Sequence, residues 1–248
     1  MGDHHSDAEF QLIWSDEFEK DGQPDSTKWN YDIGNRRGWG NNELQYYTER
    51  SENIRIENGI LIIEAHKEDF ESYDYTSCRI KTKNKGDWKY GRIEVMAKLP
   101  KGTGTWPAIW MLPTLDRPMS WPEDGEIDIM EHVGYDPGRI HGTVHTKAYN
   151  HTQGTQKAGI IELIDYGDTF HLYSIEWDAE SIKWFVDDQA YFVFKNEKTG
   201  KEAWPYDNPF HLILNIAVGG NWGGKMGVDD SIWPQRMEVD WVRVYKKE

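Results

Sequence analysis

Glu126, Asp128 and Glu131 place three carboxylic acids in one short stretch near the middle of the chain, separated only by Ile and Met. Burial among apolar side chains disfavours the charged form of an acid, and neighbouring carboxylates push one another's pKa values apart. One acid can then stay protonated as a proton donor while another remains a charged nucleophile. A strand that is acidic by chance is the alternative, but no Lys or Arg occurs between Trp121 and Val133 to pair with these acids. The pattern favours catalysis by paired carboxyl groups.

The spacing of the three acids constrains the element that carries them. On a helix, offsets of zero, two and five residues spread over more than half the circumference, so the acids could not converge. On a regular strand, Glu126 and Asp128 share a face while Glu131 points to the other. One residue bulged out around Ile129 and Met130 would restore the alternation. We therefore predict a bulged strand, on which Asp128 could share a proton with Glu126.

The distance between the two glutamates bears on the kind of reaction. Four strand steps of ~3.3 Å separate their Cα atoms by roughly 13 Å, and long side chains can lean across that gap. Retaining glycosidases need about 5–5.5 Å between carboxyl groups, whereas inverting ones need about 6.5–9.5 Å. The spacing permits retention and leaves inversion open.

The rest of the chain is dominated by alternation of apolar and polar residues. Residues 53–65 form two such segments joined by Asn58-Gly59, the strongest short hairpin signal. Similar segments cover residues 90–99, 172–194 and 236–246, and residues 210–218 form a near-continuous apolar run that ends at Gly219-Gly220. Many short strands with Gly, Asn and Asp turns predict an all-β, antiparallel two-sheet sandwich. The long connections 101–125 and 148–170 are expected to be loops that build a groove on one face.

Length and cysteine content limit the classes of protein. The 248 residues are expected to form one domain, and no apolar run approaches membrane-spanning length. The single cysteine, Cys78, excludes an internal disulfide and a Cys-based zinc site. The start, Met1 to His5, does not resemble a signal peptide, so the sequence is either a mature form or one from which a signal peptide has been omitted. We expect the protein to be secreted and extracellular.

Charge and aromatic content point to a neutral sugar polymer as the substrate. The formal net charge is −15, with 43 acidic residues against 28 Lys and Arg, which disfavours nucleic acid and sulfated polymers. Aromatic residues make up 14% of the chain, including 13 Trp, more than core packing alone requires. Because C–H faces of sugars stack on aromatic rings, this surplus suggests a carbohydrate cleft.

Several further segments accompany the acidic stretch EIDIME (126–131). They are WSDEF (14–18), WGNNELQYY (39–47), YTSCRIKT (75–82), GTWPAIWML (104–112), HGTVH (141–145), VGGNW (218–222) and VDWVRVY (239–245). Together, over about residues 10–245, these segments make the chain resemble glycoside hydrolase family 16. The acidic stretch has the longer form with the bulge residue, which is typical of the endo-β-1,3-glucanases, or laminarinases, of that family.

The resemblance implies a fold and a mechanism. The fold would be a β-jelly roll, or concanavalin A-like sandwich, whose concave sheet forms the glucan cleft. Glu126 would be the nucleophile, Glu131 the general acid/base and Asp128 the assisting carboxylate. The reaction would cleave β-1,3-glucosidic bonds in laminarin-type glucans through a covalent glycosyl-enzyme, with retention and without a catalytic cofactor.

The resemblance also implies sugar-binding residues. They are Asn42 and Arg79 toward sugar hydroxyls, Trp106, Trp110, Trp121 and Trp222 as stacking surfaces, and His145 near the carboxylates. Core packing of each Trp, and a purely structural role of His145, are the alternatives.

Metal binding is expected to be structural at most. Family members often hold calcium away from the cleft, which here implies the backbone carbonyls of Glu17 and Gly59 and the side chain of Asp240. Oxygen ligands suit calcium, although Asp240 could instead pair with Arg or Lys. His141 and His145 on one strand face raise a zinc alternative that would need a third protein ligand from elsewhere.

Three other functions compete with a β-1,3-glucanase. A mixed-linkage β-1,3-1,4-glucanase (lichenase) and a transglycosylase would use the same acids. A non-catalytic carbohydrate-binding sandwich would share the aromatic cleft, but it has no use for three mutually repelling acids. We expect a monomer that binds a neutral β-glucan and no nucleic acid or membrane.

Overall fold

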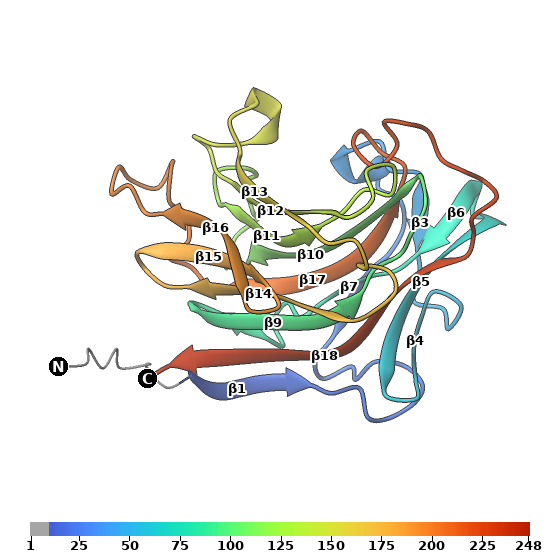
Figure 1. The fold of residues 1–248 in the computed structure, drawn as a ribbon, viewed down its shortest axis with the longest axis horizontal. Coiled ribbons are helices and arrows are strands. Elements are labelled where there is room, and N and C mark those ends of the chain that lie inside the picture. Colours follow the sequence, from blue (N-terminus) through green and yellow to red (C-terminus); the bar gives the residue numbers. More distant parts are fainter. Residues whose placement is uncertain (1–9) are drawn as a thin grey trace.

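Alternating apolar residues build two β-sheets that pack face to face in the computed structural model, which describes residues 10–248 (Figure 1). The first sheet, called the cleft sheet below, has the strand order β13-β12-β11-β10-β17-β7-β2, with β8 paired to β17. Its strands are β2 (Asn30–Asp32), β7 (Arg79–Lys81), β8 (Asp87–Trp88), β10 (Thr105–Pro113), β11 (Glu126–Glu131), β12 (Arg139–His145), β13 (Lys157–Glu162) and β17 (Phe210–Val218).

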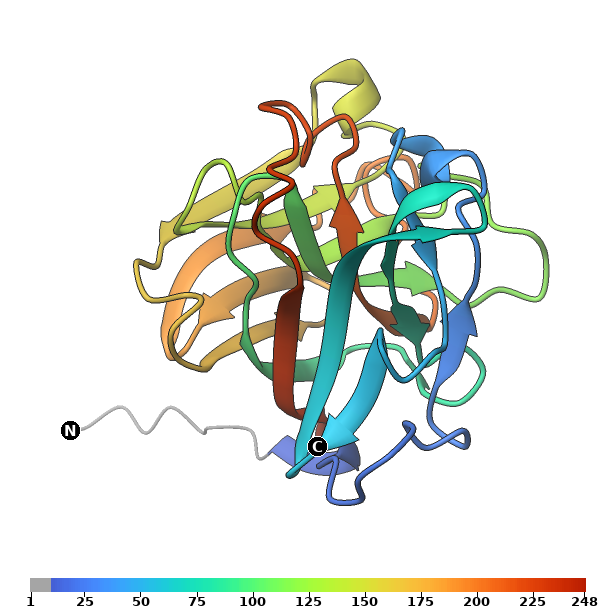
Figure 2. The same cartoon turned by 90° about the vertical axis from the view of Figure 1, so that its right-hand side faces the viewer.

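The second sheet, called the back sheet, has the order β16-β15-β14-β9-β18-β5-β6-β3, with β1 paired to β18 and β4 to β5. Its strands are β1 (Phe10–Asp16), β3 (Gln45–Tyr47), β4 (Ile54–Glu57), β5 (Ile60–Phe70), β6 (Tyr73–Ser77), β9 (Gly91–Lys98), β14 (His171–Trp177), β15 (Ser181–Val186), β16 (Gln189–Lys195) and β18 (Gln235–Lys247). Figure 2 shows β5 and β18 side by side in this sheet. The pairing is antiparallel except between β3 and β6, which run parallel.

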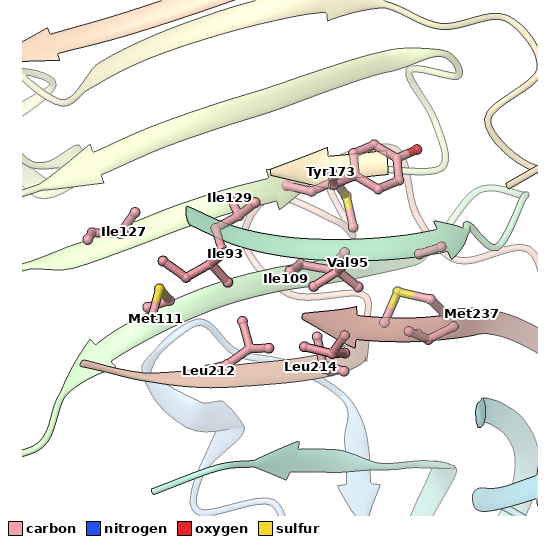
Figure 3. Packing of buried hydrophobic residues seen from close by; sticks show 14 of the residues in the cluster. Ile93, Val95, Ile109, Met111, Ile127, Ile129, Tyr173, Leu212, Leu214 and Met237 are labelled. Carbon is pink, nitrogen blue, oxygen red and sulfur yellow. The ribbon is translucent and has the colours of Figure 1, made fainter. Parts of the chain in front are cut away.

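The core fills the space between the two sheets (Figure 3). Ile93 and Val95 of β9 in the back sheet face Ile109 of β10 and Ile127 of β11 in the cleft sheet, and all four are fully buried. Each side chain of this size contributes about 1.5–3 kcal/mol when it leaves water. Packing on one face thus leaves the other face of the cleft sheet available for polar and aromatic residues.

The predicted hairpin at Asn58-Gly59 is confirmed. It joins β4 to β5, and Glu57 and Ile60 are paired across it. Asn58 and Gly59 have φ angles of 54° and 78°, as a two-residue turn with positive φ at both positions requires. The strands predicted in residues 90–99, 172–194, 210–218 and 236–246 are also present, as β9, β14 to β16, β17 and β18.

The prediction that residues 101–125 and 148–170 are loops was wrong in part. β10 occupies residues 105–113 and β13 occupies residues 157–162. β10 lies between β11 and β17, and its open face carries Trp106 and Trp110. Because both faces of this strand are apolar, its sequence shows no alternation of apolar and polar residues. Within residues 10–248 the helical elements are two 3₁₀ turns, η1 (Gly38–Gly40) and η2 (His151–Gln153), and no helix there is long and apolar enough to cross a membrane.

Candidate active site

The strand β11 contains the predicted bulge. Against β10, Met130 pairs with Ile109 and Asp128 pairs with Trp110, so Ile129 is skipped in the register. Against β12, Asp128 pairs with Thr143 and Glu131 pairs with His141, so three steps on β11 match two on β12. The bulge prediction is confirmed from both neighbouring strands.

The bulge has a clear cause in the packing of the core. Ile129 and Met130 are consecutive residues, yet both are buried among the apolar residues between the sheets. Two successive residues can point to the same side only where an extra residue interrupts the pleat. As a result Glu126, Asp128 and Glu131 all line the same cleft.

The cleft has a volume of about 840 Å³ and lies on the face of the cleft sheet that is turned away from the core. Its floor consists of alternate residues from neighbouring strands. They are Trp106, Ala108, Trp110 and Leu112 from β10, His141, Thr143 and His145 from β12, Ala158 and Ile160 from β13, Asn215 and Ala217 from β17, and Arg79 from β7. The same period of two that builds the core therefore builds the cleft.

Each glutamate accepts a hydrogen bond from a tryptophan. The indole nitrogen of Trp121 donates to Glu126 at 2.8 Å, and that of Trp106 donates to Glu131 at 3.1 Å. Asp128 lies between them on β11 and is 1% exposed, with its Oδ2 3.2 Å from His145 Nε2. The two glutamates are thus held from opposite ends of the acidic row, each by its own donor.

The electrostatics of the acids differ from one another. Burial raises the pKa of Asp128 well above its ordinary value, and the charges of Glu126 and Glu131 and a hydrogen bond to Glu126 raise it further. Burial together with the charge of Glu126 raises the pKa of Glu131 to about 8, although the Trp106 hydrogen bond opposes this. At neutral pH Glu131 is therefore a protonated acid, and Asp128 can hold a proton that it donates to Glu126.

His145 is a neutral neighbour of these acids. Burial lowers its pKa, against the opposing charge of Glu126, so the imidazole carries no charge at neutral pH. Its Nε2 lies 3.9 Å from Glu126, and its ring packs against Trp121 at 5.8 Å between centroids. His145 is therefore placed to orient the Glu126 and Asp128 carboxyl groups without changing their total charge.

Arg79 and Trp110 form one wall of the cleft. The guanidinium of Arg79 lies 4.7 Å from the ring of Trp110 and 4.7 Å from the ring of Trp39, so it is sandwiched between two indoles. Its Nε is 3.0 Å from Asp32, whose pKa burial would raise but which Arg79 and Lys81 hold below its ordinary value. Stacking and the ion pair fix the donor fork of Arg79 toward the cleft.

Trp106 and Trp222 form the corresponding surface near Glu131. Their rings meet edge to face at 5.6 Å, and Trp222 also contacts His141 at 5.0 Å. Trp121 stands at the Glu126 end, where it packs on His151 at 5.0 Å. The four tryptophans predicted as stacking residues therefore all line the cleft rather than the core.

Asn42 is the predicted contact that the structure does not bring into the cleft. Its side chain is exposed and donates to Asn221 Oδ1 at 2.8 Å. Asn41 and Asn221 line the cleft instead. The backbone at Asn42 is left-handed, with φ 55°, and Asn41 rather than Asn42 contributes to the cleft lining. Two adjacent asparagines look alike in the sequence, so this difference could not be predicted.

Several cleft residues were not predicted as ligand contacts from the sequence. They are Trp39, Asn41, Glu43, His141, His151, Asn215 and Asn221. Trp39, Asn41 and Glu43 belong to the segment WGNNELQYY, so that segment was a usable signal. His151 lies in η2, where no periodic pattern pointed to the cleft.

The zinc alternative built on His141 and His145 gains no third ligand. Within residues 10–248, the group of His, Cys, Asp and Glu side chains whose ligand atoms lie close enough to share an ion consists of Glu126, Asp128 and His145. His141 is not a member and lies opposite Glu131 instead. Two members of this group, Glu126 and Asp128, belong to the acidic row on β11.

Comparison with known proteins places the chain among carbohydrate-active enzymes. Residues 39–243 match the family model described as Glycosyl hydrolases family 16. The chain is 55% identical to a beta-glucanase of Rhodothermus marinus over 99% of this chain and 89% of that protein. The X-ray structure of the laminarinase from Rhodothermus marinus superposes with a TM-score of 0.94 at 54% identity, covering 97% of this chain and 98% of that one. SCLam, a non-specific endo-β-1,3(4)-glucanase, superposes with a TM-score of 0.91 at 48% identity, covering 96% and 92%.

Proposed function

The chain belongs to glycosyl hydrolase family 16, and from this premise we propose that it cleaves internal β-1,3-glucosidic bonds of laminarin-type β-glucans with retention of configuration. One observation carries the assignment of roles. The bulge in β11 turns Glu126, Asp128 and Glu131 onto one face of an open cleft walled by tryptophan. A long neutral polymer can lie in such a cleft and be cut at an internal bond.

In the first step Glu126 attacks the anomeric carbon while Glu131 protonates the departing glycosidic oxygen. The bond from the anomeric carbon to that oxygen breaks, and a bond to the Glu126 carboxylate forms. The protonated carboxyl group of Asp128 donates a hydrogen bond to Glu126. This bond stabilises the negative charge of Glu126 until its carboxylate becomes an ester. The indole nitrogen of Trp121 also donates to the Glu126 carboxylate and orients it.

In the second step Glu131, now ionised, takes a proton from a water molecule that attacks the same carbon. The ester to Glu126 breaks, Glu126 recovers its charge and Glu131 recovers its proton. Two displacements at one carbon return the original configuration. No cofactor takes part.

Product analysis on laminarin, curdlan and lichenan tests this function. We expect oligosaccharides of several lengths from laminarin from the earliest times, as an endo-acting enzyme gives, and NMR should detect the β-anomer first. Initial release of the α-anomer would overturn the retaining mechanism. No hydrolysis of any of the three polymers would favour the non-catalytic binding alternative.

A mixed-linkage specificity is the second candidate, because SCLam, at 48% identity, is described as a non-specific endo-β-1,3(4)-glucanase. The same acids would then cut β-1,4 bonds next to β-1,3 bonds. Comparable kcat/KM on lichenan and laminarin would favour this second candidate, and a large preference for laminarin would favour the first. Transglycosylation is scored in the same experiment as products longer than the starting oligosaccharide.

The activity should decline in alkaline solution. Glu131 must be protonated in the free enzyme, and its pKa is raised to about 8, so activity is present below that pH and is lost as the pH rises through it. We expect kcat/KM on laminarin to fall about tenfold for each pH unit above this limb. Initial rates at low substrate concentration from pH 5 to 10 measure it, and full activity at pH 10 would contradict the assignment of Glu131 as the acid.

A structural calcium site at Glu17, Gly59 and Asp240 is a further part of the proposal. The register supports it, because Asp16 pairs with Val242, Leu61 pairs with Val239, and Asp240 lies at a shift in the β18–β9 ladder. Glu17 directly follows the residue paired with Val242, and Gly59 lies two positions before the residue paired with Val239, so both are near Asp240 in the register. Two backbone carbonyls and a carboxylate would form an all-oxygen donor set, which suits calcium. The side chain of Glu17 binds Arg243, so only its carbonyl would be available.

Calcium should raise the midpoint of thermal unfolding if this site binds it. We expect millimolar Ca²⁺ to raise Tm by several degrees relative to EDTA-treated protein, since binding to the native state alone stabilises it by mass action. Asp240→Asn should abolish most of that increase. An equal increase in both proteins would contradict the proposed site, and unchanged laminarin hydrolysis in EDTA would agree with a purely structural role.

We also propose that the protein is secreted and acts as a monomer. A polymeric glucan is most accessible outside the cell, and the described residues of this chain bring the three acids and the tryptophan walls together in one cleft. Size-exclusion chromatography with light scattering tests the monomer, and assay of culture medium from the native source tests secretion.

A further inference from the structure

The loop that joins β10 to β11, residues 114–125, carries Trp121 to the end of the acidic row. The indole of Trp121 donates to Glu126, and its ring lies 5.0 Å from that of His151 and 5.8 Å from that of His145. These contacts hold the ring. Residues 116–120 of the loop are exposed, so the backbone that carries the ring needs anchors of its own.

Asp124 closes a turn around Trp121. Its backbone N–H donates to the carbonyl of Ser120 at 2.9 Å, and its carboxylate Oδ2 accepts from the backbone N–H of Ser120 at 2.7 Å. Both bonds join the same two residues, so residues 121–123 between them are enclosed in one ring. The turn is therefore closed once through the backbone and once through the Asp124 side chain, which restricts the backbone of Trp121.

Arg117 holds the same carboxylate from outside the turn. Its Nη1 donates to Asp124 Oδ2 at 2.8 Å, and its Nη2 donates to Oδ1 at 2.6 Å. The side chain of Arg117 is 55% exposed, whereas that of Asp124 is 12% exposed. The Arg117 hydrogen bonds hold the pKa of Asp124 below its ordinary value, although burial opposes this. A bidentate pair fixes direction as well as charge, so the carboxylate stays turned toward Ser120.

The chain is anchored again where it leaves the turn. Gly125 has φ 88°, and a Cβ atom built on it would lie 2.7 Å from Pro205 Cγ and 3.0 Å from the ring of Tyr206. The hydroxyl of Tyr206 donates to the backbone carbonyls of Glu126 and His145, each at 3.0 Å. Because the strand is fixed at this point, the turn itself decides how the indole meets the carboxylate.

We propose that Asp124 is a positioning residue for the nucleophile: together with Arg117 it holds the turn that presents the Trp121 indole to the Glu126 carboxylate. The proposal rests on the proposed function, because it presumes that Glu126 is the nucleophile. Asp124 and Arg117 touch no reacting atom in this scheme, and neither belongs to the residues that line the cleft. Both act through one hydrogen bond, which Trp121 donates to Glu126.

The test is a double-mutant cycle of Asp124→Asn with Trp121→Phe, measured as kcat on laminarin. Trp121→Phe keeps a ring but removes the N–H that Glu126 accepts, so kcat should fall about twentyfold, as loss of a hydrogen bond to a charged group implies. Asp124→Asn keeps the volume but loses the charge and one acceptor oxygen, so kcat should fall about tenfold. In the double variant kcat should lie within about twofold of that of Trp121→Phe alone, because the contact that Asp124 positions is already absent.

Two further variants complete the experiment. Asp116→Asn is the matched control, because Asp116 is an exposed acid in the same loop and its loss changes the net charge equally. It should keep the kcat and KM of the original protein. Arg117→Met leaves the contacts of Asp124 with Ser120, so kcat should fall only about threefold. This decrease should also disappear in the Trp121→Phe background, and Arg117→Met is the decisive variant if Asp124→Asn does not fold.

Independent action of Asp124 and Trp121 would multiply the two effects. A folded double variant whose kcat lies about two-hundredfold below that of the original protein would therefore overturn the proposal. A folded Asp124→Asn with unchanged kcat and a lowered Tm would also overturn it, since the role would then be purely structural. A decrease of similar size in Asp116→Asn would do the same, because the charge of the loop would then be sufficient. Loss of hydrolysis in the unmodified protein would instead overturn the proposed function.

Discussion

Replacing Glu126 by alanine is expected to lower kcat on laminarin by roughly five orders of magnitude, with little change in the thermal midpoint. Glu126 is the acid that Asp128 and Trp121 both serve, and without its carboxylate no covalent intermediate can form. Reducing-sugar release at long incubation times measures the residual rate. Glu162→Ala is a suitable control, since Glu162 is an exposed acid at the end of β13 and is outside the cleft lining.

Addition of azide should separate a lost nucleophile from a damaged fold. A small anion can enter the space left by the Glu126 side chain and attack the anomeric carbon directly. A single displacement by azide gives a glycosyl azide of inverted configuration, which mass spectrometry and NMR identify. Hydrolysis by Glu126→Ala at more than a hundredth of the original rate would show that another group is the nucleophile.

Replacing Glu131 by alanine is expected to have the second largest effect, a loss of about a thousandfold in kcat/KM on laminarin. The reason is the leaving group, because a sugar hydroxyl leaves poorly without a proton. A dinitrophenyl β-oligoglucoside needs no such proton, so its first step should be nearly unaffected and a burst of dinitrophenol should appear. The alkaline limb that the Glu131 pKa of about 8 produces should also be absent from the variant.

The comparison of the two substrates is the critical measurement for Glu131. Equal losses on laminarin and on the dinitrophenyl glycoside would mean that Glu131 has a structural role instead of a proton-transfer role. Glu131→Gln is the matched control for shape, because it keeps the volume and the contact with Trp106. It should lose activity on laminarin as Glu131→Ala does.

The sequence was most informative about local patterns. The period of two in residues 90–99 predicted β9, the near-continuous apolar run 210–218 predicted β17, and Asn58-Gly59 predicted the turn with two positive φ angles. The offset of five between Glu126 and Glu131 predicted a bulge, since no regular element places both acids on one face. Each of these features is a property of adjacent residues, so no distant contact was needed to infer it.

The directions of individual side chains were less predictable. Asn41 and Asn42 are adjacent and chemically identical, and the left-handed backbone at Asn42 sends one toward the cleft and the other to Asn221. β10 was partly hidden because both of its faces are apolar.

The sequence by itself determined the class of fold, the acidic row and its bulge, because backbone alternation and burial of Ile and Met are decided within a few residues. Only the tertiary structure decided which acid carries the proton. Ionisation depends on burial and on groups a few ångströms away, and for Glu131 these groups are Glu126 on the same strand, Trp106 on β10 and Glu43 before β3. The chain thus specifies its carboxylates locally, while packing of the two sheets sets their pKa values.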